Sequence, residues 1–349
     1  MKKIRILIIL LCIFSLLLFT GCSSFKNSDA EYKYGVIFSA SNNSKSTVYT
    51  YDNTGKYVSS KSIDAGGITM ASFMKFGEST GDYVYYACPI SENKPNKYLL
   101  QLNTNNLESK KIKSTDNITP THFSIDDKFA YSGSSSITTT YISKTDLYEN
   151  SILNSTEIEG QGIFMLEDTK NLYVIGIIHN TKTYGKIHVL DKTNFKISST
   201  VDLPNLSFIT DAKIINNNMY ILSNRDGNDN LTNQIIELNL NNFSTKIVEL
   251  PFNNLFNLHY YDNYMYVVEH SYHNDKTNNR IAKINLNTME VNVFSSKNDN
   301  KTSYINENRF ISSDGEKIYI YDTKNFSLIN QFDIKKAKDQ FFVSFYIKE

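Results

Sequence analysis

One pattern recurs seven times along this chain and constrains its fold more than any other feature. Each copy is an alternating apolar strand that ends in Asp, Asn or Ser, followed by a short turn and a second strand. Two clear copies are Ile187–Asp191 and Ile318–Asp322. The residues that end the seven strands are Asp52, Asn103, Ser143, Asp191, Asn239, Asn285 and Asp322. They recur about every 45 residues, and a period of this length predicts a stack of similar small sheets.

A second set of Asn- and Asp-rich turns divides each repeat further. Asn and Asp favour turns because their side chains bond the local backbone and tolerate left-handed conformations. In the repeat around Asp191 the pattern predicts four strands, at about Gly162–Leu166, Leu172–Ile178, Lys186–Asp191 and Lys196–Leu203. No later part of the chain has helical periodicity. The sequence therefore predicts an all-β fold, a seven-bladed β-propeller of four-stranded antiparallel blades.

The two ends of the repeat region predict how the ring closes. The first strand, Tyr34–Ser39, leads directly into the first copy of the pattern, so the first blade lacks an innermost strand. One strand, Gln340–Ile347, is left over after the seventh copy. We expect this strand to complete the first blade, because that hides two unpaired edges. Residues 33–349 would then form a single propeller domain.

The N-terminal segment has the features of an export signal. Lys2, Lys3 and Arg5 precede an apolar run, Ile6–Phe19, that is shorter than the roughly 20 residues of a membrane span. The following Phe19-Thr20-Gly21-Cys22 resembles a bacterial lipobox, although Phe19 stands where leucine is commonest. The resemblance implies that residues 1–21 are cleaved and that Cys22 is acylated. An ordinary secretory signal or an uncleaved anchor is the alternative.

Acylation of Cys22 would fix where the protein acts. Two or three acyl chains hold a protein on a bilayer almost irreversibly. Residues 22–32 are polar and read as the lipidated cysteine with a flexible tether. We therefore expect a protein anchored in the cell membrane that faces outside the cytoplasm.

The charge composition bears on which classes of partner the protein can bind. The chain has 36 basic and 36 acidic residues, and loss of the signal with Lys2, Lys3 and Arg5 leaves a nearly neutral protein. This balance gives no electrostatic basis for binding nucleic acid. After Cys12 and Cys22, only Cys88 remains, so we expect no disulfide.

The repeat around Asp191 resembles a known family. Lys186–Ile197 is similar to the repeat of YVTN-type propellers, which occur in many bacterial surface and secreted proteins. The WD40 repeat fits less well because it depends on tryptophan, which this chain lacks. The resemblance implies a seven-bladed propeller and no single activity.

Turn-to-turn distances predict where the longer loops lie. They indicate long second-to-third-strand loops in blades two, four, five and six, on one face of the ring. Binding residues concentrate on loops that a rigid scaffold holds. Exposed loops are also polar when they have no function, so the binding site predicted from these loops is a hypothesis. The candidate binding rim consists of His179, Tyr184, Arg225, Asp226, Asp229, Glu269, His270, His273 and Asp275.

Two parts of this rim have residues that metals use. Asp226–Asn230 has the oxygen ligands and the glycine of a calcium loop, but the glycine comes too early for an EF-hand, and a plain turn is the simpler interpretation. His270, His273 and Asp275 could hold a transition metal, although three-residue spacing on a loop is a weak indication. We therefore predict no metal site and no cofactor.

No catalytic motif supports an enzymatic activity. The sequence has no nucleophile elbow, phosphate loop or His-Glu-x-x-His motif. We therefore predict no catalytic residues and a binding or scaffold module for a protein, a glycan or an envelope component. The alternative is a calcium-dependent hydrolase that resembles sugar-lactonase propellers, with Glu269 or Asp211 near the channel. Most of the 24 Tyr and 21 Phe residues should pack between sheets.

Overall fold

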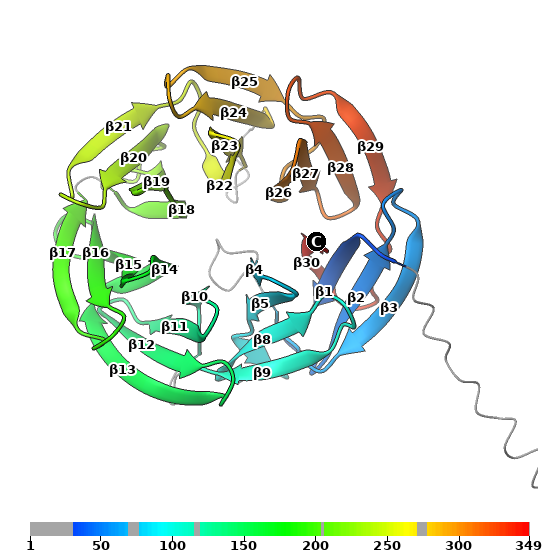
Figure 1. The fold of residues 1–349 in the computed structure, drawn as a ribbon, viewed down its shortest axis with the longest axis horizontal. Coiled ribbons are helices and arrows are strands. Elements are labelled where there is room, and N and C mark those ends of the chain that lie inside the picture. Colours follow the sequence, from blue (N-terminus) through cyan, green and yellow to red (C-terminus); the bar gives the residue numbers. More distant parts are fainter. Residues whose placement is uncertain (1–30, 69–76, 115–118, 204–205, 271–277, 349) are drawn as a thin grey trace, which may run out of the picture. The chain divides into compact units, whose positions relative to one another are not determined.

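Seven four-stranded antiparallel sheets surround a central channel (Figure 1). The computed structural model describes residues 31–68, 77–114, 119–203, 206–270 and 278–348. Residues Tyr32–Glu349 form one compact unit. The structure thus confirms the predicted all-β, seven-bladed propeller. The predicted signal, Cys22 and most of the tether lie outside the described residues. No helix among the described residues has the length and apolarity needed to cross a membrane.

The blades are numbered in chain order, each from its innermost strand outward. Blade one contains β30 (Phe341–Ile347), β1 (Tyr34–Ser39), β2 (Ser46–Tyr51) and β3 (Tyr57–Ile63). Blade two contains β4 (Glu78–Thr80), β5 (Tyr83–Ala87), β8 (Tyr98–Asn103) and β9 (Ser109–Lys113), with the small hairpin β6 (Ile90–Ser91) and β7 (Lys94–Pro95) between β5 and β8. Blade three contains β10 (His122–Ile125), β11 (Phe129–Ser135), β12 (Thr139–Asp146) and β13 (Ser151–Glu159).

The remaining four blades follow the same order. Blade four contains β14 (Gln161–Glu167), β15 (Asn171–Ile178), β16 (Tyr184–Asp191) and β17 (Ile197–Leu203). Blade five contains β18 (Phe208–Ile215), β19 (Asn218–Arg225), β20 (Gln234–Asn239) and β21 (Thr245–Glu249). Blade six contains β22 (Leu255–Tyr261), β23 (Tyr264–Glu269), β24 (Arg280–Asn285) and β25 (Val291–Ser295). Blade seven contains β26 (Thr302–Asn306), β27 (Arg309–Ser313), β28 (Lys317–Asp322) and β29 (Leu328–Asp333).

The last strand of the chain closes the ring. β30 pairs antiparallel with β1, from Tyr34 opposite Ile347 to Ser39 opposite Phe341. It lies beside the first strands of the chain at the centre of the disc (Figure 1). This confirms that the C-terminal strand is the innermost strand of the first blade. This pairing covers the edge of β1, which would otherwise be open toward the channel.

The recurring Asp and Asn residues fix the turn between the third and fourth strands. In blade four the Asp191 carboxylate accepts hydrogen bonds from the backbone N–H of Thr193 (2.8 Å) and of Asn194 (3.0 Å). These N–H groups hold the pKa of Asp191 below its usual value. Phe195 then adopts a left-handed φ of 57°, and its N–H donates to Asp191 O at 2.8 Å. Its ring is buried, so the turn also supplies a core residue.

One copy of the pattern was placed wrongly. Ser143 does not end its strand, because β12 continues to Asp146. The Ser143 side chain is buried, and its hydroxyl bonds that of Ser132 at 2.9 Å on the neighbouring strand. Asp146 makes the turn instead, since its carboxylate accepts the N–H groups of Tyr148 and Glu149. With Asp146 as the strand end, the repeat is more regular than the sequence pattern predicted.

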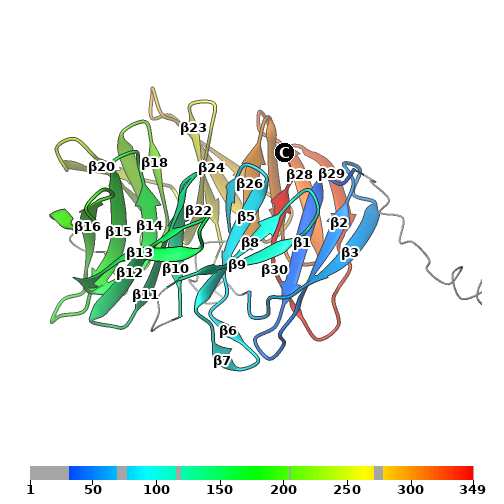
Figure 2. The ribbon, with the colours of Figure 1, turned by 60° about the horizontal axis from the view of Figure 1, so that its bottom comes forward.

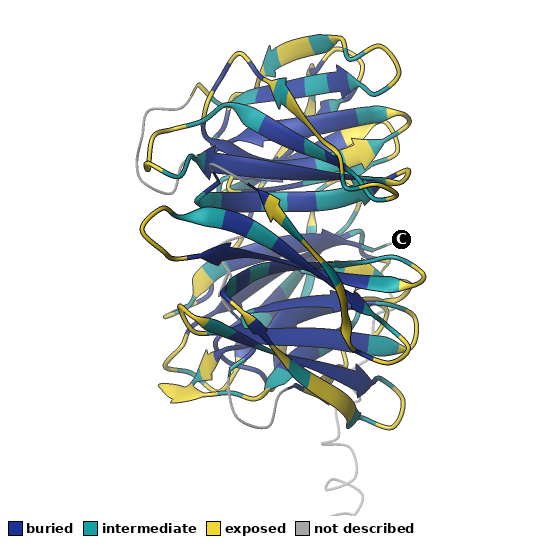
Figure 3. Ribbon diagram, turned by 90° about the vertical axis from the view of Figure 1, so that its left-hand side faces the viewer, coloured by how far each residue is buried: buried dark blue, intermediate teal, exposed yellow. Residues whose placement is uncertain are grey.

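Apolar contacts between neighbouring blades form the core. The inner three strands of the blades are largely buried, whereas the outermost strands are more exposed (Figure 3). Tyr and Phe pack between sheets as expected, for example Phe294 stacked on Phe326 with ring centroids 4.5 Å apart. Tyr34 meets Phe332 at 5.4 Å across the closure between blades one and seven. Cys88 is buried as a free thiol.

The disc has two different faces. The described residues of the second-to-third-strand loops and of the links between blades form one face, which we call the loop-rich face (Figure 2). The first-to-second and third-to-fourth turns form the opposite one, the turn face. The second-to-third loops of blades one to five and of blade seven are residues 40–45, 88–97, 136–138, 179–183, 226–233 and 314–316. In blade six, the described residues between the second and third strands are 270, 278 and 279.

The extra length predicted for blade four is not a long loop. It lies in the strands β15 and β16, which pair continuously from Asn171 opposite Asp191 to Ile178 opposite Tyr184. A turn-to-turn distance cannot separate a longer loop from a longer hairpin, because both add residues between the same two turns.

Candidate functional site

The blade-four residues of the candidate rim lie at the end of a hairpin. His179 is exposed in the loop 179–183, and its Nε2 lies 2.9 Å from Gln161 Oε1. Tyr184 begins β16 and is half-buried. Both residues therefore lie on the loop-rich face, and His179 lies next to Gln161 at the start of the innermost strand of the blade.

The blade-five loop is a self-contained turn. The Asp226 carboxylate accepts the N–H groups of Asn230 (2.9 Å) and Asn228 (2.8 Å), which lower the pKa of Asp226. Arg225 donates to Asp229 O at 2.8 Å and approaches the Asp229 carboxylate at 3.6 Å. The carboxylates thus serve the loop backbone and the arginine, which supports the plain-turn interpretation of Asp226–Asn230.

The two described blade-six residues of the rim, Glu269 and His270, are buried rather than exposed. Glu269 is only 1% exposed, and Arg280 donates to its two oxygens at 2.7 and 3.0 Å. The N–H groups of Asn278 and Arg280 also donate to this carboxylate. His270 Nδ1 lies 2.6 Å from Asp299 Oδ1. Burial alone would raise the pKa of Asp299, but the bond to His270 holds it below its usual value. His273 and Asp275 lie outside the described residues.

A hollow of about 610 Å³ lies on the loop-rich face between blades five and six. The Glu269–Arg280 pair forms one side, and Leu231 and Asn233 of the blade-five loop form another. The Arg280 guanidinium also lies over the Phe252 ring, 4.8 Å from its centroid. The structure thus brings residues of two blades together here, where a rigid ion pair meets the 38% exposed side chain of Leu231.

A second, more apolar hollow lies on the same face at blade one. It has a volume of about 450 Å³ and is lined by residues 39–42, Ile68 and Phe341–Val343. Phe341, the first residue of β30, is 78% exposed. Sequence reasoning missed this site because β30 was considered only as the strand that closes the ring.

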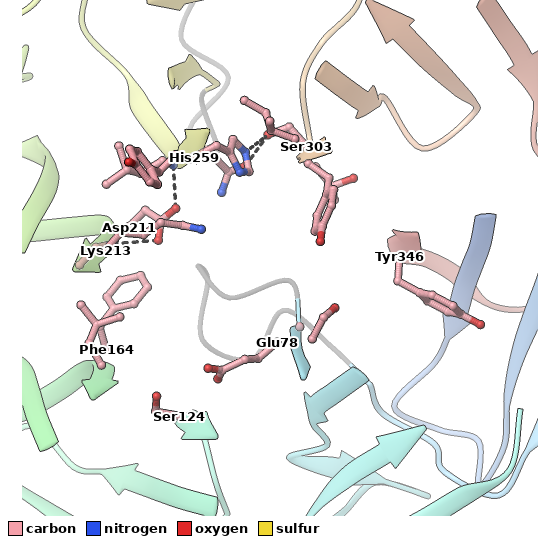
Figure 4. Close-up of a pocket in the computed structure, with 18 of the residues that line it drawn as sticks. Glu78, Ser124, Phe164, Asp211, Lys213, His259, Ser303 and Tyr346 are labelled. Carbon is pink, nitrogen blue, oxygen red and sulfur yellow. Dashed lines mark hydrogen bonds between the residues drawn. The ribbon is translucent and has the colours of Figure 1, made fainter. Parts of the chain in front are cut away.

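The central channel contains a further cavity of about 520 Å³ (Figure 4). The innermost strands of all seven blades contribute to its wall. Phe164 of blade four and Tyr346 of blade one line the cavity with buried rings, and Glu78, Ser124 and Glu167 add polar groups from blades two to four. Blades five to seven contribute further polar side chains. Those polar residues are Asp211, Lys213, Asn257, His259 and Ser303.

His259 is a strongly perturbed titratable group of the channel. Its Nε2 lies 2.7 Å from the Ser303 hydroxyl of the next blade. Burial, assisted by the positive charge of Lys213, lowers the pKa of His259 to about 3. The imidazole is therefore neutral at any pH at which the fold normally works.

The acidic residues of the channel do not gather at one point. Asp211 accepts the N–H of Leu258 at 2.7 Å, and Glu167 bonds Lys192 at 2.6 Å. Burial raises the pKa of Glu167 despite this lysine. Within the described part of the chain, no three His, Cys, Asp or Glu side chains lie close enough to share a metal ion. Of the two residues considered for a lactonase-like site, Asp211 lines the channel, whereas Glu269 lines the hollow on the loop-rich face.

The sequence contains one feature that indicates channel residues and that a search for long loops does not use. Asp211 and Lys213 interrupt the otherwise apolar strand Phe208–Ile215, and charged residues two apart lie on one side of a strand. Charges on an innermost strand lie near the channel. That placement could have been predicted once the strand order was assigned.

Comparison with known proteins supports the fold. No protein-family model matches the sequence, and no curated protein matches it either. Among solved structures, a chain of the mitotic checkpoint complex aligns with a TM-score of 0.58 at 10% identity, over 79% of this chain and 84% of that one. The computationally designed protein Ika8 aligns with a TM-score of 0.55 at 11% identity, over 87% and 85%. The WD40 domain of Pan2 from Neurospora crassa aligns with 0.51 at 11% identity, over 92% and 94%. The chain shares its overall fold with these proteins.

Proposed function

We propose that this chain is a membrane-anchored, extracytoplasmic binding module whose loop-rich face holds a protein, a glycan or an envelope component. The lipobox-like Phe19–Cys22 supports the anchor, and Cys22 would carry the lipid. The YVTN-like repeat supports a surface location. The rigid disc supports binding with little change in backbone shape.

The observation that carries the binding proposal is the distribution of exposed apolar side chains. Among the described residues, four aliphatic or phenylalanine side chains are exposed on the loop-rich face, and two of them lie beside the hollows, whereas the exposed large side chains of the turn face are the tyrosines Tyr83, Tyr148 and Tyr260. The four on the loop-rich face are Ile90 (43% exposed), Ile137 (64%), Leu231 (38%) and Phe341 (78%). Apolar side chains surrounded by polar loops are typical of protein-binding surfaces, so a protein partner is favoured over a glycan.

The anchor is tested by replacing the cysteine. We expect Cys22→Ser to abolish labelling by a radioactive fatty acid and to move the protein from the membrane fraction to the medium. Ser24→Ala, two residues away, is the matched control and should remain labelled. Lipid labelling of the Cys22→Ser protein would contradict the anchor.

The binding surface is tested by substitution on each face. We expect Leu231→Ser combined with Phe341→Ser to reduce co-purification of a cross-linked partner from intact cells by about tenfold, because central apolar contacts dominate interface energies. Tyr148→Ser, which removes an 88% exposed ring from the turn face, is the control. Equal losses from both variants would contradict the assignment to the loop-rich face.

A further inference from the structure

The polar wall of the central channel is rigid because hydrogen bonds join neighbouring blades. Asp211 of blade five accepts the N–H of Leu258 of blade six. Thr210 donates to Leu255 O at 2.8 Å between the same blades. His259 of blade six bonds Ser303 of blade seven. Three innermost strands are thus connected, and their side chains are already in place before any ligand arrives.

Lys213 differs from the other polar residues of this wall. It is half-buried, yet its ammonium makes no hydrogen bond or ion pair with any described residue. Two other half-buried lysines are engaged: Lys186 binds Glu159 at 2.9 Å, and Lys283 donates to Thr323 O at 2.9 Å. A partly desolvated ammonium with three unused donors favours an anionic acceptor in the cavity.

The neighbouring His259 supplies a different kind of contact. Ser303 donates its proton to Asn257 Oδ1, so the His259 Nε2–H donates to Ser303. The Nδ1 of this neutral ring is then an acceptor, and it makes no hydrogen bond to a described residue. The acceptor Nδ1 of His259 beside the ammonium of Lys213 is complementary to a ligand that has a hydroxyl group beside a carboxylate.

Two further features limit the ligand. Glu78 lies across the channel from Lys213 (Figure 4), and Glu167 and Asp211 also line the cavity, so their negative charges disfavour a second carboxylate on the ligand. Phe164, which is 2% exposed, lines the wall with an apolar ring, whereas the ring of Tyr346 points away from the cavity (Figure 4). The volume of about 520 Å³ is in the range of small-molecule sites.

We propose that the channel binds a hexuronate-type sugar acid, with its single carboxylate on Lys213 and a hydroxyl group on Nδ1 of His259. This site is separate from the loop-rich face, so it stands or fails independently of the partner-binding proposal.

Calorimetric titration of the full chain in mild detergent, at pH 7 and constant ionic strength, tests this proposal. D-glucuronate and D-galacturonate are the probes. D-glucose lacks the carboxylate, acetate lacks the hydroxyl groups, and D-glucarate has a second carboxylate. We expect saturable binding of at least one uronate, and affinities about tenfold or more weaker for the other three compounds.

Variants assign the binding to the channel. Lys213→Gln should weaken uronate binding by about tenfold or more, whereas Lys213→Arg, which retains the charge, should retain most of it. Lys324→Gln removes an exposed lysine from the turn face and is the matched control. Circular dichroism checks that each variant is folded. No saturable uronate binding, binding unaffected by Lys213→Gln, or equally tight acetate binding would each overturn the proposal.

Discussion

At the scale of single residues, His259 links the channel to the stability of the fold. The folded state keeps the imidazole neutral down to a pKa of about 3, whereas the unfolded chain protonates near pH 6.5. Below pH 6.5 the unfolded state therefore binds the proton first, and the free energy of unfolding falls as the pH falls. Each pH unit in this range costs up to ~1.4 kcal/mol from this group.

Urea unfolding at pH 7 and pH 5 measures this dependence. We expect the wild-type protein to lose up to ~2 kcal/mol more than His259→Gln over this interval, because the variant lacks the titrating ring. His179→Gln removes an exposed ring and is the control. Parallel losses in the wild-type protein and His259→Gln would show that His259 does not couple protonation to folding.

The Glu269–Arg280 pair predicts a second single-residue effect. Arg280→Ala would leave a carboxylate that is 1% exposed without its cation, so we expect the free energy of unfolding to fall by about 3 kcal/mol. Lys246→Ala removes a 63% exposed lysine side chain whose ammonium lies 4.0 Å from the Glu237 carboxylate, and should cost less than ~1 kcal/mol. Chemical unfolding of both variants gives the comparison, and similar losses would contradict a buried, structural ion pair.

Sequence reasoning succeeded at residues whose role is local. Asp191 and Asp322 were predicted as turn residues, and each accepts backbone N–H groups within the next few residues. The prediction that a strand ends at Ser143 was wrong. From the sequence alone, a serine in a turn cannot be distinguished from a buried serine whose hydroxyl bonds a neighbouring strand. Lys213 and His259 were missed because their importance depends on neighbouring blades, which a local pattern does not contain.

At the scale of secondary-structure elements, β30 carries the closure of the ring. Removing residues 339–349 would expose the edge of β1 and the buried surface around Tyr34 and Val36. We expect the truncated protein to unfold or aggregate, as measured by circular dichroism and size-exclusion chromatography. A synthetic peptide of residues 339–349 should restore the monomer by pairing with β1. A soluble truncated monomer with an unchanged melting temperature would contradict the closure.

The strands of blade four show how much of an element a sequence pattern can predict. The predicted Leu172–Ile178 and Lys186–Asp191 agree closely with β15 (Asn171–Ile178) and β16 (Tyr184–Asp191). Their alternating apolar residues face sheets on both sides, so burial fixes the strand position. The loop between them could not be measured from turn spacing, because the pleated hairpin extends further than the apolar pattern.

At the scale of the whole molecule, Tyr and Phe perform the packing between blades that tryptophan provides in WD40 proteins. Phe326, at the turn after β28, stacks on Phe294 of blade six and meets Phe310 at 5.6 Å. The same turn therefore ends a hairpin and fills the space between two blades. Because the same turn defines a hairpin and packs against the next blade, one short pattern predicts both the strand order and the closed ring of blades.

Binding on the loop-rich face is the central proposal about function, and the sequence predicted only part of this site. The face itself follows from the order of strands, which the repeat predicted. The hollows do not, because they require the positions of loops from different blades, such as Leu231 beside Arg280.

Site-specific photo-cross-linking in intact cells tests this claim most directly. A photoreactive residue at Ile137 or Leu231 samples the loop-rich face, and one at Tyr148 or Lys324 samples the turn face. We predict a discrete cross-linked product from Ile137 and Leu231 and none from Tyr148 and Lys324. Cross-linking only from the turn-face positions, or equal products from both faces, would contradict the account.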